Sequence, residues 1–172
     1  MRKGVLILSL LCYYGTGECA AQANPGKEAD ANMLINGSFE DGMEAWTTAH
    51  DWYAMPPGAG VSSWTIDTAI AKAGRASLRV DGQGKRGIAM QNFPIFPGKF
   101  KVEGWIKCEG LGDAQAQILV EWMDASHQWI SGSPVGGVTG TTEWTRVSGE
   151  VESPKNARYV HFDLCLLYTS PS

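Results

Sequence analysis

The sequence predicts an all-β protein folded as an antiparallel β-sandwich. Short segments of alternating apolar and polar residues recur along the chain, and turn-forming Gly and Pro residues separate them. No segment shows a convincing helical period. The chain has 172 residues, which fits one domain, and its 21 glycines and 7 tryptophans favour sheet over helix.

Residues 1–23 are expected to form a secretion signal rather than part of the folded domain. Arg2 and Lys3 supply positive charge, residues 5–12 form a short apolar run, and residues 21–23 have the A-x-A form of a cleavage site. The apolar run is too short to span a bilayer. We therefore expect a secreted mature chain that begins at Asn24.

The folded part follows a polar lead-in, residues 24–31, and is expected to occupy residues 32–164. Its clearest strand signals are segments in which every second residue is apolar. One face of each strand should enter a core between two sheets, while the other meets solvent. The segments are 76–80, 100–108, 114–124 and 157–164.

Residues 165–172, CLLYTSPS, resemble the read-through translation of a sequencing-library adapter. We expect the native sequence to break off near Leu164, which would leave the last strand of the sandwich missing. The alternative is a genuine C-terminal tail. Cys108 would then be the natural cysteine of the mature chain, and we expect it to be a buried structural thiol. Lipid attachment at Cys19 would need a small residue where Glu18 stands.

The charge balance argues against nucleic acid or an anionic membrane as a partner. The formal net charge is −4 and the pI is near 5.3. The longest basic run is the pair Lys85-Arg86, which is too short for a phosphate-binding surface.

Four motifs occur in order along the domain. The first is N-G-x-F-E-x-G…W over residues 36–46, and the others are AGRASLRV at 73–80, PGKFKVEGWIK at 97–107 and GTTEWTRVSGEVESP at 140–154. Together they resemble carbohydrate-binding modules of the family 4/9/22 type, which have a galactose-binding-domain-like jelly roll. The resemblance covers about residues 32–164.

This resemblance implies a jelly-roll sandwich that binds polysaccharide beside a glycoside hydrolase domain, often with one structural calcium ion. Asn36-Gly37 can turn tightly and direct carbonyl groups to one point, where Glu40 would add a hard anionic oxygen. In the family, a further carboxylate comes from a last strand that would lie beyond Leu164. Glu40 is thus an expected calcium ligand without its partner, or else an acid that stabilises the turn.

Sugar-binding sites use flat aromatic rings together with amide and carboxylate groups. Trp105 lies on the polar face of its predicted strand, where it is either a sugar platform or a ring that covers an edge. Gln91 and Gln117 would join it if their strands share a sheet, as would Glu121, Tyr159 and His161.

Loop tryptophans are the second group of candidates, because loops of a rigid scaffold often carry function. Trp52, Trp64 and Trp129 lie in such segments. The alternative is that some of these rings only seal the sandwich. The remaining three tryptophans, Trp46, Trp122 and Trp144, are expected in the core.

No motif indicates an enzyme. Glycoside hydrolysis needs two carboxylates about 5–10 Å apart, and no motif fixes such a pair. There is no G-x-S-x-G, no zinc-ligand spacing, and GQGKRG at 82–87 reads as a hairpin turn. We expect a secreted, non-catalytic polysaccharide-binding module that serves an attached hydrolase. The alternative is a non-binding structural or adhesion domain of a larger secreted protein.

Overall fold

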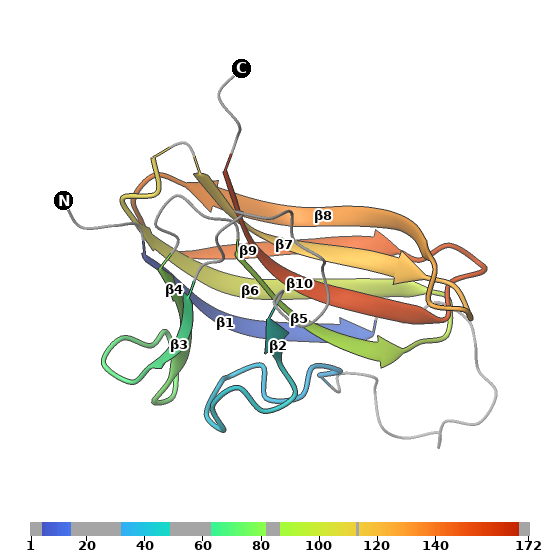
Figure 1. Cartoon of the computed structure of the whole chain (residues 1–172), viewed down its shortest axis with the longest axis horizontal. Helices are drawn as coiled ribbons and strands as arrows, with labels where there is room; N and C mark the ends of the chain where they lie inside the picture. Colours follow the sequence, from blue (N-terminus) through green and yellow to red (C-terminus); the bar gives the residue numbers. More distant parts are fainter. Residues whose placement is uncertain (1–4, 15–31, 49–62, 82–86, 113, 169–172) are drawn as a thin grey trace.

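The computed structural model contains two five-stranded antiparallel sheets packed face to face (Figure 1). It describes residues 5–14, 32–48, 63–81, 87–112 and 114–168. The predicted all-β sandwich is therefore confirmed. In this part of the chain, no helix has the length and apolar character needed to cross a membrane.

The first sheet, sheet A, has the strand order β3-β4-β1-β6-β9. β1 is its central strand and pairs at ten positions with β6 and at four with β4. The strands are β1 (Val5–Tyr14), β3 (Ser63–Asp67), β4 (Ser77–Asp81), β6 (Lys99–Glu109) and β9 (Thr142–Glu152).

The second sheet, sheet B, has the order β2-β5-β10-β7-β8. Its central strand, β10, pairs along most of its length with β5 on one side and with β7 on the other. The strands are β2 (Thr47–Thr48), β5 (Gly87–Pro94), β7 (Ala114–Met123), β8 (Trp129–Thr139) and β10 (Tyr159–Tyr168).

All four alternating segments of the sequence occur as strands, namely β4, β6, β7 and β10. β10 continues to Tyr168, and Cys165 and Leu166 are fully buried within it. The structure thus places part of the segment 165–172 in sheet B and part of the segment 1–23 in sheet A. The adapter origin of the first segment and the removal of the second stay predictions.

The two sheets contact each other along one side, where β8 lies against β9. A Cβ atom on Gly136 would lie 3.1 Å from Cγ1 of Val147, and one on Gly149 would lie 3.3 Å from Cγ1 of Val135. β8 and β9 are the edge strands of the two sheets on the same side. Counted from that side, the third strands of the two sheets lie opposite each other. The central strands β1 and β10 therefore face each other across the sandwich.

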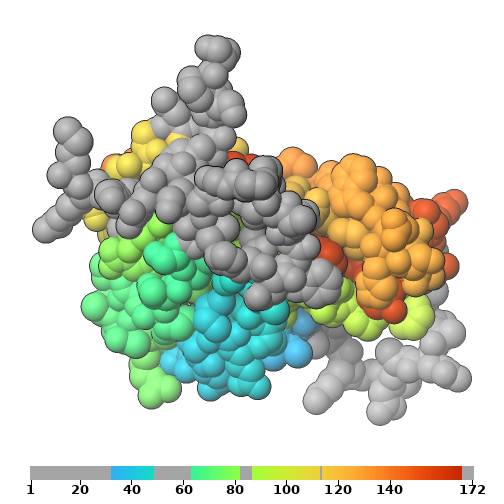
Figure 2. Space-filling model, in the orientation of Figure 1, coloured from blue at the N-terminus to red at the C-terminus, as the bar shows by residue number. Residues whose placement is uncertain are grey.

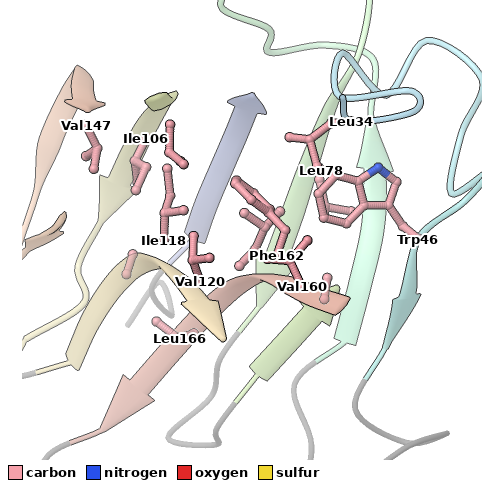
Figure 3. Close-up of a cluster of buried hydrophobic side chains, with 14 of the residues drawn as sticks. Leu34, Trp46, Leu78, Ile106, Ile118, Val120, Val147, Val160, Phe162 and Leu166 are labelled. Atoms are coloured by element: carbon pink, nitrogen blue, oxygen red, sulfur yellow. The ribbon is translucent and has the colours of Figure 1, made fainter. Parts of the chain in front are cut away.

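The core fills the space between the sheets (Figure 3). Phe162 of β10 is 1% exposed, and the ring of Trp46 meets it edge-on at 6.3 Å between centroids. Residues 32–48, which carry Trp46, lie beside residues 63–81 along the lower edge of the molecule (Figure 2). They contribute Trp46 to the core.

The core predictions hold for Trp46 and Trp122, which are 5% and 1% exposed, but Trp144 is only half-buried. Trp144 falls where the pairing of β6 with β9 shifts register between Ile106 and Cys108. An irregularity of this kind re-aims side chains and breaks the alternation used for the prediction.

Cys108 is the buried thiol that the sequence predicts. It is 1% exposed, and burial raises its pKa to about 11. The side chain is therefore a neutral thiol at physiological pH, which suits packing and opposes nucleophilic chemistry.

Candidate functional site

The outer face of sheet B carries the best candidate site, and the alternation of β7 creates it. Val120 and Trp122 are buried in the core, so Glu121 and Met123 point to the opposite face. Residues that pair across antiparallel strands share a face. This rule extends the site from β7 to both of its neighbours.

β10 and β8 add the next side chains. The register sets His161 opposite Glu121, and it sets Tyr159 of β10 and Trp129 of β8 opposite Met123. Tyr159, Met123 and Trp129 thus form one row across three strands. With strands about 4.8 Å apart, the backbones carrying Tyr159 and Trp129 are roughly 10 Å apart.

The turn between β7 and β8 places a further ring over this row. The Oδ1 atom of Asp124 accepts hydrogen bonds from the amides of Ser126 (2.8 Å) and Gln128 (3.0 Å), which holds the turn closed. His127 adopts a left-handed backbone conformation with φ of 58°. Its imidazole stacks on Tyr159 with 3.8 Å between ring centroids and 26° between planes.

Trp129 is the exposed member of the row. It is 61% exposed, although tryptophan is normally well buried. Its Nε1 atom donates a hydrogen bond to Oε1 of Glu121 at 3.0 Å. The contact holds one edge of the indole while most of the side chain stays in solvent, as a stacking platform requires.

A groove of about 470 Å³ continues the site beyond Tyr159. Phe96, 81% exposed, stands at this groove, and Ala125 joins it to the β7–β8 turn. This end of the molecule is where orange atoms of β8 adjoin red atoms near the start of β10 (right in Figure 2). The residues that line the groove are Pro94, Ile95, Phe96, Ala125, Arg158 and Tyr159.

We call the resulting area the aromatic surface and define it by Trp129, Glu121, His127, Tyr159 and Phe96. His161 lies beneath it, 8% exposed. Burial lowers the pKa of His161, the Glu121 carboxylate opposes that change, and His127 adds to it. His161 is therefore neutral at neutral pH, and the surface combines flat rings with the Glu121 carboxylate.

Three sequence-predicted candidates, Trp129, Glu121 and Tyr159, lie on the aromatic surface. Gln117 is half-buried on the same outer face but four residues before Glu121 along β7, about 13 Å away. Gln91 is 4% exposed, and its side-chain amide bonds both the N–H and the C=O of Ile35. We therefore leave Gln91 out of the site.

Two other predicted tryptophans, Trp105 and Trp64, lie elsewhere. Trp105 belongs to sheet A, so it cannot share a face with the sheet B residues, and Nζ of Lys72 sits 4.3 Å from its ring centroid. Trp64 is half-buried and packs against the core. Trp52 lies outside the described residues. Neither Trp105 nor Trp64 therefore lies on the aromatic surface.

Sequence reasoning missed Phe96 and His127. A signal for Phe96 was present, because its ring directly precedes the Pro97-Gly98 turn and follows Pro94 and Ile95. His127 lies in a short polar turn, and only the left-handed backbone conformation directs its ring onto Tyr159. That orientation cannot be read from residue types.

Glu40, the predicted calcium ligand, lies in a turn that Asn36 organises. The Asn36 side chain donates to the carbonyl of Gly42 at 3.0 Å and accepts from the amide of Asp41 at 3.2 Å. Trp46 Nε1 donates to the Asn36 carbonyl at 3.1 Å. The motif N-G-x-F-E-x-G…W thus encodes a folded turn closed by its own tryptophan.

The Glu40 carboxylate joins this turn to the start of β4. Oε1 accepts hydrogen bonds from the amides of Arg75 (2.6 Å) and Ala76 (3.2 Å), and Oε2 accepts one from Arg75 Nε (3.1 Å). These contacts lower the pKa of Glu40, and the hydrogen bond from the Arg75 amide has the largest effect. Glycine suits position 74, because its φ of 71° lies in the left-handed region and a Cβ atom there would displace the Glu40 carboxylate.

This arrangement does not fit a calcium ion. Three N–H donors surround the carboxylate, whereas calcium needs six to eight oxygen ligands. Within the described ranges, no group of three or more His, Cys, Asp or Glu side chains could hold a metal ion. Calcium binding stays a prediction of the sequence.

No family model matches the chain, and no curated protein matches it significantly. Among solved structures, the enzymatically active domain of tailspike protein 4 from bacteriophage CBA120 is similar, with a TM-score of 0.58 and 12% identity. The match covers 77% of this chain and 19% of that chain, so this chain spans about a fifth of the tailspike structure. At this identity the likeness concerns the fold alone.

Two family 22 carbohydrate-binding modules are also similar. One is the C-terminal module of Clostridium thermocellum Xyn10B, with a TM-score of 0.46, 14% identity and coverage of 74% of this chain and 80% of that one. The other is the xylan-binding CBM22-1 domain of Paenibacillus barcinonensis Xyn10C, with a TM-score of 0.47, 14% identity and coverage of 77% and 93%.

The hydrogen bonds between Glu40 and the start of β4 should stabilise the fold in a pH-dependent way. A carboxyl group with a lowered folded pKa contributes stability above its unfolded pKa, and that contribution disappears as pH falls through the folded value. Glu40→Gln should therefore lower the urea midpoint at pH 7, and the deficit should shrink below pH 4.5. Glu44→Gln, an exposed acid of the same turn, is the matched control. Equal urea midpoints of the two variants at pH 7 would show that the Glu40 hydrogen bonds do not stabilise the fold.

The imidazole of His161 should titrate below its ordinary value of 6.5, because burial disfavours its charged form. Glu121→Gln should lower the pKa of His161 further, because the Glu121 charge favours protonation. NMR titration of the imidazole C–H signals measures both values. A pKa of 6.5 or above in the wild type, or a rise in the variant, would show that the two groups are not arranged as described.

Proposed function

We propose that this protein binds polysaccharide, without cleaving it, on the aromatic surface of sheet B. The observation that carries the proposal is Trp129, whose indole is 61% exposed and held at one edge by Glu121. Tryptophan is enriched at binding interfaces, because its ring offers a large apolar face together with a polar N–H group. Fixing the ring before binding reduces the entropy lost when a ligand stacks on it.

The layout of the rings suits an extended chain of sugar units. Trp129 and Tyr159 lie in one row across the sheet, and Phe96 prolongs the row past the groove. Pyranose rings can stack on the exposed rings of Trp129 and Phe96, because each sugar presents a flat patch of C–H groups, while the His127 imidazole stacks on Tyr159 between them. Glu121 is placed to accept hydrogen bonds from sugar hydroxyls.

The charge of the site favours a neutral glycan over a polyanion. The chain carries a formal net charge of −4, and the aromatic surface includes the Glu121 carboxylate. Arg158, beside the groove, directs its guanidinium to the carbonyls of Lys155 (3.0 Å) and Ala157 (2.7 Å). Nucleic acid and anionic membrane surfaces are therefore poor partners.

The site favours binding over catalysis. A glycosidase needs an acid and a second carboxylate that both reach the sugar. Here Glu121 is bonded to Trp129, and the neighbouring carboxyl group on the same face, Asp163, is 1% exposed. A pair so placed cannot flank a glycosidic bond.

The proposal extends to the setting of the protein. Secretion rests on the signal-like residues 1–23, and service to an attached glycoside hydrolase domain rests on the resemblance of the four sequence motifs to carbohydrate-binding modules. Among the similar solved structures, one from Clostridium thermocellum joins a CBM22 module to a GH10 module with xylohexaose bound. That description belongs to that protein.

Trp129→Ala should weaken polysaccharide binding about tenfold or more, as expected for an aromatic anchor. Affinity gel electrophoresis in xylan, mixed-linkage β-glucan and agarose measures the retardation. Trp105→Ala is the matched control, because it removes an indole from the opposite sheet. It should leave retardation unchanged.

Two results would contradict the proposal. A wild-type chain that is not retarded by any of the polysaccharides would favour a non-binding structural or adhesion domain. Retardation lost in Trp105→Ala and kept in Trp129→Ala would move the site to sheet A.

A further inference from the structure

The groove of about 470 Å³ adjoins the aromatic surface at the end of sheet B where β5 and β7 end and β10 begins (Figure 1). Tyr159 and Phe96 belong to both. The register sets Tyr159 opposite Pro94 of β5 and opposite Met123 of β7, so the groove continues the row that leads to Trp129. A glycan bound along this row therefore passes the mouth of the groove.

Three connections between strands build the groove, and the backbone of Arg158 holds them together. The Arg158 carbonyl accepts a hydrogen bond from the amide of Ile95 at 2.9 Å, and the Arg158 amide donates to the carbonyl of Met123 at 2.8 Å. Ala125 lines the groove from the β7–β8 turn, which the Asp124 carboxylate closes. The groove is thus held in shape before a ligand arrives, which reduces the entropy lost on binding.

The walls of the groove do not suit an unsubstituted sugar ring. Four of the six residues that line it have no polar side-chain atom, namely Pro94, Ile95, Phe96 and Ala125. A pyranose carries hydroxyl groups around most of its edge. Each hydroxyl that loses water without gaining a hydrogen-bond partner costs free energy. An apolar group attached to the sugar enters the same space without that cost.

The rings at the groove favour an aromatic group over a small aliphatic one. Phe96 is 81% exposed, and Tyr159 offers a second ring at the same groove. A planar ring gains from offset or edge-on contact with both. An acetyl group has too few atoms to contact more than a small part of a groove of this size.

Arg158 adds one polar requirement. Its guanidinium hydrogen bonds to the carbonyls of Lys155 and Ala157 both come from Nη1, so Nη2 can donate to an acceptor on a ligand in the groove. The net charge of −4 disfavours a ligand that is itself an anion. An ester carbonyl is a neutral acceptor, and an ester is also the bond that joins an acyl group to a sugar hydroxyl.

We propose that the groove is a subsite for an aromatic acyl group, and that the polysaccharide bound by this protein carries such groups as esters on its hydroxyls. The inference rests on the proposed function, because the aromatic surface holds the sugar chain. The sugar chain stacks on Trp129, and the acyl ring lies in the groove against Phe96 and Tyr159. The ester carbonyl accepts a hydrogen bond from Arg158.

Paired forms of one polysaccharide test the subsite. Each polysaccharide of the retardation assay is used plain, with a few hydroxyl groups esterified by 4-hydroxycinnamic acid, and after alkali has removed those esters. Ala125→Tyr fills the groove from a position outside the aromatic surface. Ser126→Tyr is the matched control, because it adds the same side chain at the next residue, which does not line the groove. Urea midpoints check that both variants fold.

The wild type should bind the esterified form about tenfold more tightly than the plain form, as expected for a buried aromatic group, and alkali should abolish the difference. Ala125→Tyr should bind both forms as the wild type binds the plain form, while Ser126→Tyr should keep the preference. Equal binding of both forms by the wild type, or a preference kept in Ala125→Tyr, would overturn the subsite and leave the proposed function standing. Retardation by neither form would overturn both.

A second measurement uses the acyl group without any sugar. Methyl 4-hydroxycinnamate is added to the full chain, and the backbone amide signals are followed by NMR. The signals of Phe96, Ala125 and Arg158 should shift, and Ala125→Tyr should suppress these shifts. An absence of shifts at the groove, or shifts that persist in Ala125→Tyr, would overturn the subsite independently of the polysaccharide assay.

Discussion

The pairing of β10 with β5 and β7 is the constraint on which the rest of the structure depends. One face of β10 carries Phe162 into the core, where Trp46 packs against it. The other face carries Tyr159 and His161 to the outside of sheet B, beside Glu121 and beneath His127. A shift of β10 by one residue would exchange the two faces, so the same register sets both the core and the aromatic surface.

The sequence predicted the strands whose alternation is clean and missed features that depend on strand neighbours. β7 and β10 alternate regularly, so their buried faces were predictable. Nothing in the sequence assigned Trp105 to one sheet and Glu121 to the other, and that assignment decides which residues share a face. β8 lacked a strand pattern altogether, because four of its residues are glycine or proline, namely Gly132, Pro134, Gly136 and Gly137.

The candidate site was predictable in part. Trp129 was predicted as a loop ring, and the structure places it at the first position of β8, on an exposed face. Gln91 has a residue type that suits sugar binding, but its amide is used to hold Ile35. Glu40 likewise has the chemistry of a metal ligand, and the structure gives it backbone and guanidinium donors instead. Residue type defines what a side chain can bind, and packing decides which partner reaches it.

The most direct test of the account is an NMR titration of the tryptophan indole N–H signals with soluble xylan and β-glucan oligosaccharides. The account predicts that the Trp129 signal shifts on addition of a bound sugar, since its ring is exposed and its N–H is held by Glu121. The signals of Trp46, Trp105 and Trp122 should stay in place. Shifts confined to Trp105, or no shift with any neutral glycan, would contradict polysaccharide binding on the outer face of sheet B.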